Sequence, residues 1–173
     1  MTSEDLGVND ECGSCELHDR RRFLVRAAAF LAMGSALLPA ALQAATLSRS
    51  TRIAGTRDRL GRVRYPIPTA DGVSIDAENE VIIVRIAGTV IAFALACPHQ
   101  RAMLRQKGGD TAFKCPKHKS EYKADGVFIR GRATRNMDRR SIQRHGDELS
   151  VDIESLIRSD ENSAAWQAAT IAV

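Results

Sequence analysis

The chain has 173 residues, enough for one domain and a leader, and its four cysteines are too few for a disulfide scaffold. Its net charge is +4, and the surplus lies after residue 45, where 21 Lys and Arg stand against 15 Asp and Glu. Aromatic residues are few and no helix rich in Lys and Arg is expected. The charge therefore argues against nucleic-acid binding and favours an anionic partner or a membrane face.

Residues 1–45 have the features of an export leader. Arg20 and Arg21 precede an uncharged run, Ala27 to Ala45, that is mostly Ala and Leu. This pattern resembles a twin-arginine signal, so we expect export to the periplasmic face of the inner membrane. A run of about nineteen residues just spans a bilayer, so the leader is expected either as an anchor or as a cleaved segment. The alternative is a buried Ala-rich helix of the domain.

Two further cysteines lie in this leader. Cys12 and Cys15, with His18 nearby, fit either a small metal or redox site or a solvated leader segment without such a role. Because no second ligand pair accompanies them, we favour the solvated segment. Residues 46–62 follow, rich in Arg, Gly, Thr and Ser with little periodicity, and this composition predicts a flexible tether.

Short β-branched runs bounded by turn residues predict an all-β domain over residues 63–158. Residues 63–68, with two prolines, suggest an edge strand. Residues 80–86 and 89–95, separated by Ala87-Gly88, predict a hairpin whose second strand leads into Cys97. Residues 110–114 lead in the same way into Cys115. Each of these cysteines therefore begins a loop at the end of a strand, as a rigid metal site requires.

The remaining chain continues in short strands and ends in a tail. The predicted strands are residues 121–123, 126–129, 141–144 and 148–153. His145 lies in the turn between the last two, so we expect it to be exposed and not a ligand. The tail, residues 159–173, predicts a short helix capped by Ser159 or Asp160, with Trp166 packing onto the sheet.

Two loops carry the chemistry of the chain. One contains Cys97 and His99, and the other contains Cys115 and His118. Structural zinc sites usually take two cysteines from one knuckle, whereas each loop here mixes Cys and His. This order suits a two-iron cluster with two thiolates on one iron and two imidazoles on the other. A zinc-stabilised interaction module remains the alternative from a different class of function.

Cys-x-His, fifteen residues and then Cys-x-x-His is similar to the signature of Rieske iron–sulfur proteins. The resemblance implies small antiparallel sheets, a cluster-binding subdomain at about residues 96–123, and one 2Fe-2S cluster held by Cys97, His99, Cys115 and His118. It also implies that the histidines lie at the exposed edge and meet the redox partner. The resemblance to members with a retained N-terminal segment favours an anchor.

Residues around the loops indicate which kind of Rieske protein is expected. Ser120 and Tyr122 match the hydroxyls that, in high-potential members, donate to a cluster sulfide and to a ligand cysteine sulfur. In quinol-oxidising members each ligand loop has an extra cysteine, and the two form a disulfide. Lys117 occupies the second of these positions here, and Ala102 or Met103 lies near the first. This difference favours ferredoxin-like members. Gly131-Arg132-Ala133-Thr134 resembles the family's third loop without its prolines.

The resulting functional prediction is a redox subunit with no catalytic residue of its own. It would pass single electrons from quinol or a partner oxidoreductase to a periplasmic cytochrome, as implied by resemblance to the iron–sulfur subunit of quinol–cytochrome c reductases and to the small subunit of arsenite oxidase. A ferredoxin-like carrier of lower potential is the alternative within the class. The chain has no room for a second iron domain, which argues against a catalytic oxygenase.

Overall fold

The structure is a computed structural model, and it describes residues 50–108 and 112–173. All of these residues belong to the second of two compact units, Ala40–Val173. The twin arginines, the leader and its cysteines lie outside the described residues. Within the described ranges, no helix has the length and apolar character needed to cross a membrane.

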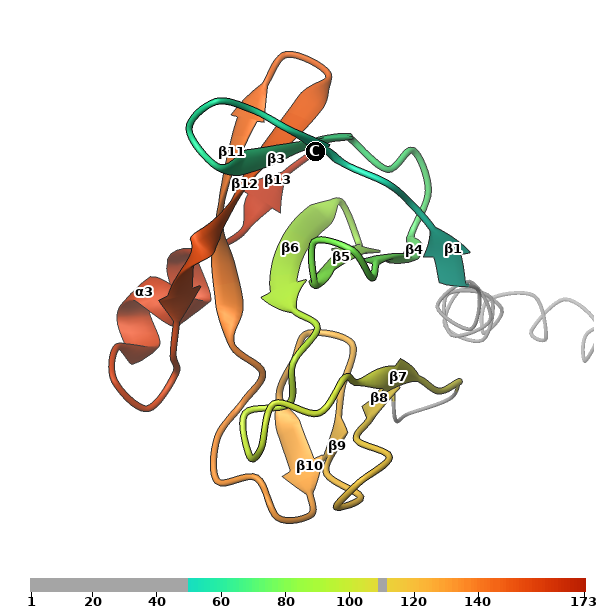
Figure 1. The fold of residues 1–173 in the computed structure, drawn as a ribbon, viewed down its shortest axis with the longest axis vertical. Coiled ribbons are helices and arrows are strands. Elements are labelled where there is room, and N and C mark those ends of the chain that lie inside the picture. Colours follow the sequence, from blue (N-terminus) through green and yellow to red (C-terminus); the bar gives the residue numbers. More distant parts are fainter. Residues whose placement is uncertain (1–49, 109–111) are drawn as a thin grey trace, which may run out of the picture. The chain divides into compact units, whose positions relative to one another are not determined.

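Nine described strands form one large sheet (Figure 1). They are β1 (Ser50–Arg52), β2 (Thr56–Arg57), β3 (Arg62–Pro66), β4 (Gly72–Asp76), β5 (Val81–Ile86), β6 (Thr89–Ala94), β11 (Arg139–His145), β12 (Glu148–Ile157) and β13 (Ile171–Ala172). The order is β1-β4-β5-β6-β11-β12-β3-β2, and β13 pairs with β6. One short helix accompanies this sheet in the described residues, so the expected all-β class with a short C-terminal helix is confirmed.

The hairpin β5–β6 is the central pair of the sheet. Its register runs without interruption from Val81 opposite Ala94 to Ile86 opposite Thr89. Ala87 and Gly88 both have positive φ, 47° and 74°, as a tight two-residue hairpin turn requires. The β-branched residues are buried on both faces, and β6 leads through Leu95 and Ala96 to Cys97. The hairpin predicted from sequence is therefore present.

The expected tether over residues 46–62 is wrong where the structure describes it. β1 pairs in parallel with β4, and β2 pairs with β3, so β3 lies between β12 and β2 and is not an edge strand. The segment between β1 and β2 is held by Asp76, whose carboxylate accepts from the Gly55 amide at 2.9 Å and from the Tyr65 hydroxyl at 3.0 Å. Backbone pairing and one buried carboxylate thus order a segment whose own side chains are mostly exposed.

The tail after residue 158 also rejoins the sheet. Helix α3 (Ser163–Ala168) begins after Asn162, whose side chain accepts from the Ala165 amide, so neither Ser159 nor Asp160 is the cap. Trp166 is buried, and its Nε1 donates to the Met137 carbonyl at 2.7 Å. Trp166 packs onto the sheet as the sequence predicted, whereas strand β13 was not predicted.

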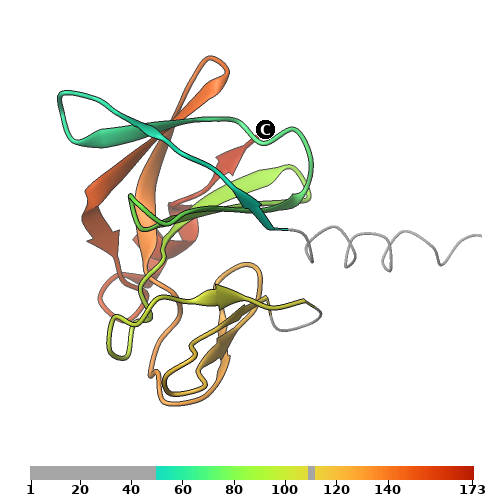
Figure 2. The same ribbon diagram turned by 45° about the vertical axis from the view of Figure 1, so that its right-hand side comes forward.

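A second, smaller sheet is inserted between β6 and β11. It consists of β7 (Arg105–Gln106), β8 (Phe113–Lys114), β9 (Glu121–Tyr122) and β10 (Phe128–Arg130), in the order β10-β9-β8-β7. Figures 1 and 2 show it below the large sheet, joined to it by the segments that leave β6 and return to β11. The end of β6 and the segment that returns to β11 are in contact, since the Ala94 amide donates to the Asp138 carbonyl at 3.0 Å.

Two hydrophobic cores lie within the described residues. One is formed by β3, β12 and part of the β5–β6 hairpin. The other continues from the hairpin into the small sheet and includes Phe93, Phe113, Tyr122, Cys97 and Cys115. The two cysteines are therefore part of a core that both sheets share.

Candidate metal centre

The two ligand loops have the same backbone hydrogen-bond pattern. In the first, the Cys97 amide donates to the Ala102 carbonyl at 2.9 Å, and the Arg101 amide donates to the Cys97 carbonyl at 2.8 Å. In the second, the Cys115 amide donates to the Ser120 carbonyl at 2.8 Å, and the Lys119 amide donates to the Cys115 carbonyl at 3.1 Å. In the sequence, only the shared Cys-Pro start indicates this equivalence.

A left-handed residue closes each loop. Arg101 has φ of 54° and Lys119 has φ of 58°, and each lies four residues after its cysteine. Residues other than glycine rarely adopt this conformation, and it is found where surrounding structure holds it. The two loops are thus held in one defined conformation, which presents a Cys and a His from each.

The loops bring the thiols together on the inside and the imidazoles together on the outside. Cys97 and Cys115 are each about 1% exposed, and both are free thiols whose side chains lie close to one another. Burial raises the pKa of the Cys97 thiol. His99 and His118 are half-buried, with their Nδ1 atoms 3.1 Å apart and their rings edge to face at 4.7 Å. Burial, followed by the nearby His99, lowers the pKa of His118.

This donor set fits a two-iron cluster. In the described part of the chain no three Cys, His, Asp or Glu side chains gather as they would around a single ion. The four groups form two pairs instead, one of thiols and one of imidazoles. A pair for each iron is the arrangement of a cluster with mixed thiolate and imidazole ligation.

Tyr122 and Ser120 lie behind the thiols and are fully buried. The Tyr122 hydroxyl lies 3.5 Å from the Cys97 sulfur, and burial followed by this contact raises the Tyr122 pKa. The Ser120 side chain lies near Tyr122 and partly offsets this rise in pKa, and the Ser120 Oγ accepts from the Ala133 amide at 3.0 Å. The hydroxyl of Tyr122 thus reaches a cysteine sulfur as the sequence suggested, and Ser120 connects the second loop to the third.

The third loop packs directly on the second. Gly131 has φ of 122°, and a Cβ at this position would lie 2.3 Å from the Ser120 Cα. Only glycine allows this approach. The third loop therefore lies against the backbone of the second ligand loop.

Sequence reasoning missed an ion-pair cluster beside the centre. Glu121, between the two hydroxyl residues, is 2% exposed and accepts from Lys114 at 2.5 Å and from Arg130 at 2.7 Å. These hydrogen bonds lower the Glu121 pKa to about 2. The alternation of side chains along the strand could have indicated that Glu121 lies on the other face, because residues 120 and 122 face the centre and residue 121 faces away.

Comparison with known proteins identifies the domain. Residues 67–148 match the model of the Rieske 2Fe-2S domain. The cytochrome b6-f complex iron-sulfur subunit of Synechococcus sp. (strain JA-3-3Ab) is 36% identical over 64 residues, which are 36% of this chain and 37% of that protein. The matched part is thus little more than a third of that relative. The crystal structure of the cyanobacterial plasma membrane Rieske protein PetC3 from Synechocystis PCC 6803 gives a TM-score of 0.38 at 23% identity, covering 53% of this chain and 86% of that one.

This family match covers 82 residues, somewhat less than half of the chain. The chain contains a Rieske 2Fe-2S domain over residues 67–148, and this domain binds a 2Fe-2S cluster.

Proposed function

We propose that this protein is a single-electron carrier that receives electrons from quinol or from a partner oxidoreductase and passes them to a periplasmic cytochrome. The observation that carries the proposal is the pairing of two buried thiols behind two half-buried imidazoles. The imidazole pair is the part of this centre that reaches the surface. A partner that approaches this edge comes within short range of the ligands without opening the core.

We further propose that Cys97 and Cys115 hold one iron, and that His99 and His118 hold the other. The bound cluster supplies a one-electron couple, within about −150 to +300 mV for centres of this ligation. The chain fixes the ligands through the two closed loops, whose backbone hydrogen bonds leave them little freedom. Preorganised ligands move little between two oxidation states, which favours fast electron transfer.

Residues behind and beside the loops favour the upper part of the potential range. The Tyr122 hydroxyl lies 3.5 Å from the Cys97 sulfur inside a core where water does not compete, and it would donate to a Cys97 thiolate that holds iron. Lys117 and Arg132 place positive charge near His118. Donors and cations both stabilise an added negative charge. A positive midpoint potential is the expected result.

One observation favours the ferredoxin-like alternative of lower potential. Cys97 and Cys115 are the free cysteines of the described residues, and Lys117 stands in the second loop where quinol-oxidising members have a cysteine. The midpoint potential separates the two readings. A negative value would remove quinol as the donor and leave a lower-potential partner.

The ligand assignment is tested by alanine substitution in the full-length protein. Replacing Cys97, His99, Cys115 or His118 should remove the visible absorption and the iron, and should weaken the fold, because cluster binding contributes to folding free energy. Cys12→Ala is the matched control and should retain both. Iron, sulfide and zinc analysis accompany the spectra. A colourless wild-type protein that contains one zinc would refute the electron-carrier function. If a variant keeps its full iron content, the residue replaced in it is not a ligand.

We propose export by the twin-arginine route to the periplasmic face of the inner membrane, either anchored or released. The support is the leader sequence around Arg20 and Arg21. This route carries proteins that are already folded, which suits a domain loaded with a cluster before export.

A further inference from the structure

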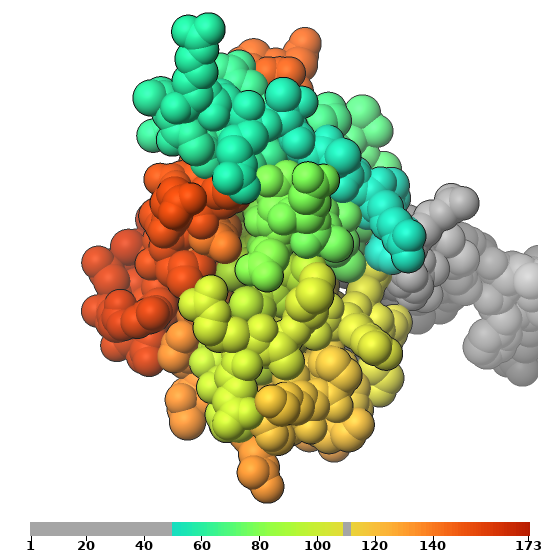
Figure 3. Space-filling model, in the orientation of Figure 1, coloured from blue at the N-terminus to red at the C-terminus, as the bar shows by residue number. Residues whose placement is uncertain are grey.

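A cavity of about 150 Å³ lies beside the first ligand loop. One wall is formed by Cys97 and Pro98, and the opposite wall by the end of β12 at Leu156 and by the next turn. In Figure 3 the yellow-green segment around the first loop lies next to the orange-red segment that ends β12. The cavity is several times larger than the volume that one water molecule requires, so it has room for a small polyatomic ion.

Four arginines line this cavity, namely Arg101, Arg135, Arg140 and Arg158. The one carboxylate in the lining is Asp138, and it is already engaged, because Arg135 donates to its two oxygens at 2.9 and 3.1 Å. Arg158 is paired outside the lining, with Glu161 at 2.6 Å. Among the described residues, Arg101 and Arg140 form no salt bridge.

Arg140 is the unusual member of the set. It is 8% exposed, and its Nη1 donates to the backbone carbonyls of Ile153 and Ser155 on β12. Its Nε has no hydrogen-bond partner, and within the described residues no carboxylate forms a salt bridge with it. Three carboxylates, Glu80, Asp152 and Glu154, act on it only from longer range. Buried charges normally have a paired counter-charge, so this one points to a missing anion.

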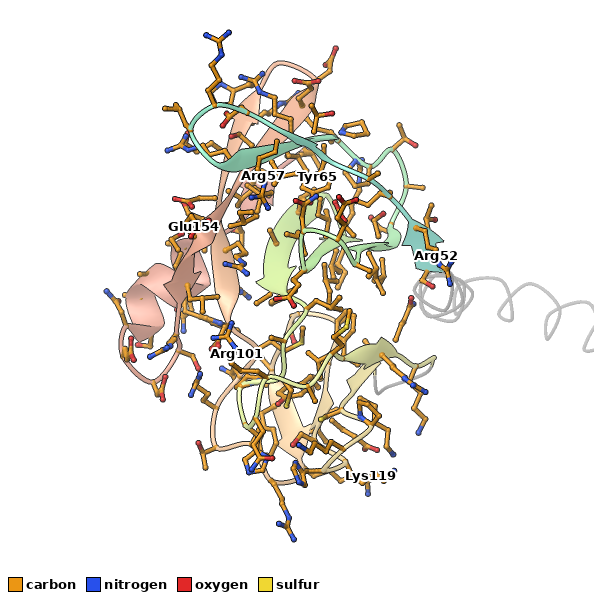
Figure 4. The ribbon with its side chains drawn as sticks, in the orientation of Figure 1. Arg52, Arg57, Tyr65, Arg101, Lys119 and Glu154 are labelled. Carbon is orange, nitrogen blue, oxygen red and sulfur yellow. The ribbon has the colours of Figure 1, made fainter. Side chains whose placement is uncertain are left out.

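Arg101 faces the same space from the first loop. It is exposed, and it lines the same cavity as Arg140, so the two positive charges face one space. Figure 4 shows Arg101 on the side of the loops toward β12 and α3, whereas Lys119 lies on their far side. The left-handed backbone of Arg101 holds the side chain at this position. An anion between two such groups would remove their repulsion and use the planar donors of both.

We propose that this cavity is a binding site for one small oxyanion of the phosphate or carboxylate class, held between Arg101 and Arg140 and against the wall formed by Cys97 and Pro98. The site needs no metal in order to bind its ligand. The same chemistry has two possible sources, a free anion such as phosphate or an acidic side chain of a protein partner.

Occupation of the site affects the metal centre, and this part rests on the proposed role of Cys97 as a ligand. A negative charge beside Cys97 disfavours the electron added on reduction, so the oxidised protein should bind the anion more tightly. If that preference is about tenfold, the midpoint potential falls by about 59 mV when the site fills. The midpoint potential of the cluster would thereby depend on the anion concentration or on the presence of a docked partner.

The experiment is isothermal titration calorimetry of the full-length, cluster-loaded protein with inorganic phosphate, at an ionic strength kept constant with chloride. Wild-type protein should bind one phosphate, and Arg101→Gln should weaken the binding about tenfold or more, because a charged hydrogen-bond donor is lost. Arg132→Gln is the control: it removes an exposed arginine of the third loop, outside the cavity, and should leave phosphate binding unchanged. Arg140→Gln gives a second test where the variant folds.

A parallel titration with a tetra-aspartate peptide separates the sources. Tighter binding of the peptide assigns the site to a partner's carboxylates, and tighter binding of phosphate assigns it to a free anion. Absence of binding by both ligands, or equal phosphate binding by wild type and Arg101→Gln, would overturn the site. This result can be distinguished from a failure of the electron-carrier proposal. A wild-type protein that binds phosphate but contains no cluster would contradict only the electron-carrier function. A cluster-loaded protein that binds neither ligand would contradict only the anion site.

Discussion

Removal of one hydroxyl, by Tyr122→Phe, tests how the chain sets the redox potential. The hydroxyl lies 3.5 Å from the Cys97 sulfur, and both residues are at most 1% exposed, so water cannot replace the lost donor. The aromatic ring is retained, and its edge-to-face contact with Phe128 at 5.8 Å should persist. The substitution therefore removes one donor with little change in packing.

The size of the effect follows from hydrogen-bond energetics. A hydrogen bond to a charged group contributes about 1.5–3 kcal/mol in total, and only the part that differs between oxidation states moves the potential. With about 59 mV per factor of ten in a one-electron equilibrium, a difference of roughly 1–2 kcal/mol lowers the midpoint by on the order of 50–100 mV. Ser120→Ala should act in the same direction, because it removes a second buried hydroxyl, which lies next to Tyr122.

Protein-film voltammetry on the wild type and the variants measures these shifts. Tyr65→Phe is a matched control, because it removes another buried tyrosine hydroxyl, one that binds Asp76 at 3.0 Å in the other core. It should lower stability and leave the midpoint unchanged. An unchanged midpoint in Tyr122→Phe, or an equal shift in Tyr65→Phe, would refute the proposed role of the Tyr122 hydroxyl.

Three further predictions concern stability and export. Gly131→Ala should destabilise the protein by more than about 2 kcal/mol in chemical denaturation, since its Cβ would overlap the second loop, whereas Gly146→Ala, with φ of 60° and open space, should cost about 1 kcal/mol. Equal losses would contradict this. Two cationic partners lower the pKa of Glu121 from 4.5 to about 2, so its contribution to stability is present above pH 4.5 and is lost as pH falls toward 2. Glu121→Gln should flatten this acid limb of the unfolding free energy, and an unaltered limb would exclude Glu121 as its source. Replacing Arg20 and Arg21 by Lys should leave the loaded protein in the cytoplasm on cell fractionation, and undiminished export would contradict a twin-arginine route.

The sequence was most informative where side chains alternate or recur. The β5–β6 hairpin was predictable because β-branched residues flank a turn that favours positive φ. The two Cys/His loops were predictable because metal ligands impose fixed residue types at fixed spacing. The role of the Tyr122 hydroxyl was predicted from the family resemblance, and its contact with Cys97 supports that prediction.

Elements that depend on distant partners were missed. The residues of β1 and β2 are exposed, so no hydrophobic period marks them, and their order comes from pairing with β4 and β3. β13 has two residues, too few for any period, and forms because β6 offers it an edge. The arginine-lined cavity draws Arg101 and Arg158 from positions 57 residues apart, and only the tertiary fold brings them together. The leader and its signals remain sequence-based predictions.

The buried arginines of β11 have a consequence for how the centre responds to its surroundings. Arg139 donates to the Trp166 and Asp125 carbonyls, and Arg140 donates to carbonyls of β12. Backbone carbonyls do not titrate, and arginine remains protonated throughout the physiological range. The positive potential that these two residues create is therefore a constant of the fold. Acidification or alkalinisation of the surrounding solution would leave this part of the field unchanged, so a domain built in this way keeps its electrostatic bias across the physiological pH range.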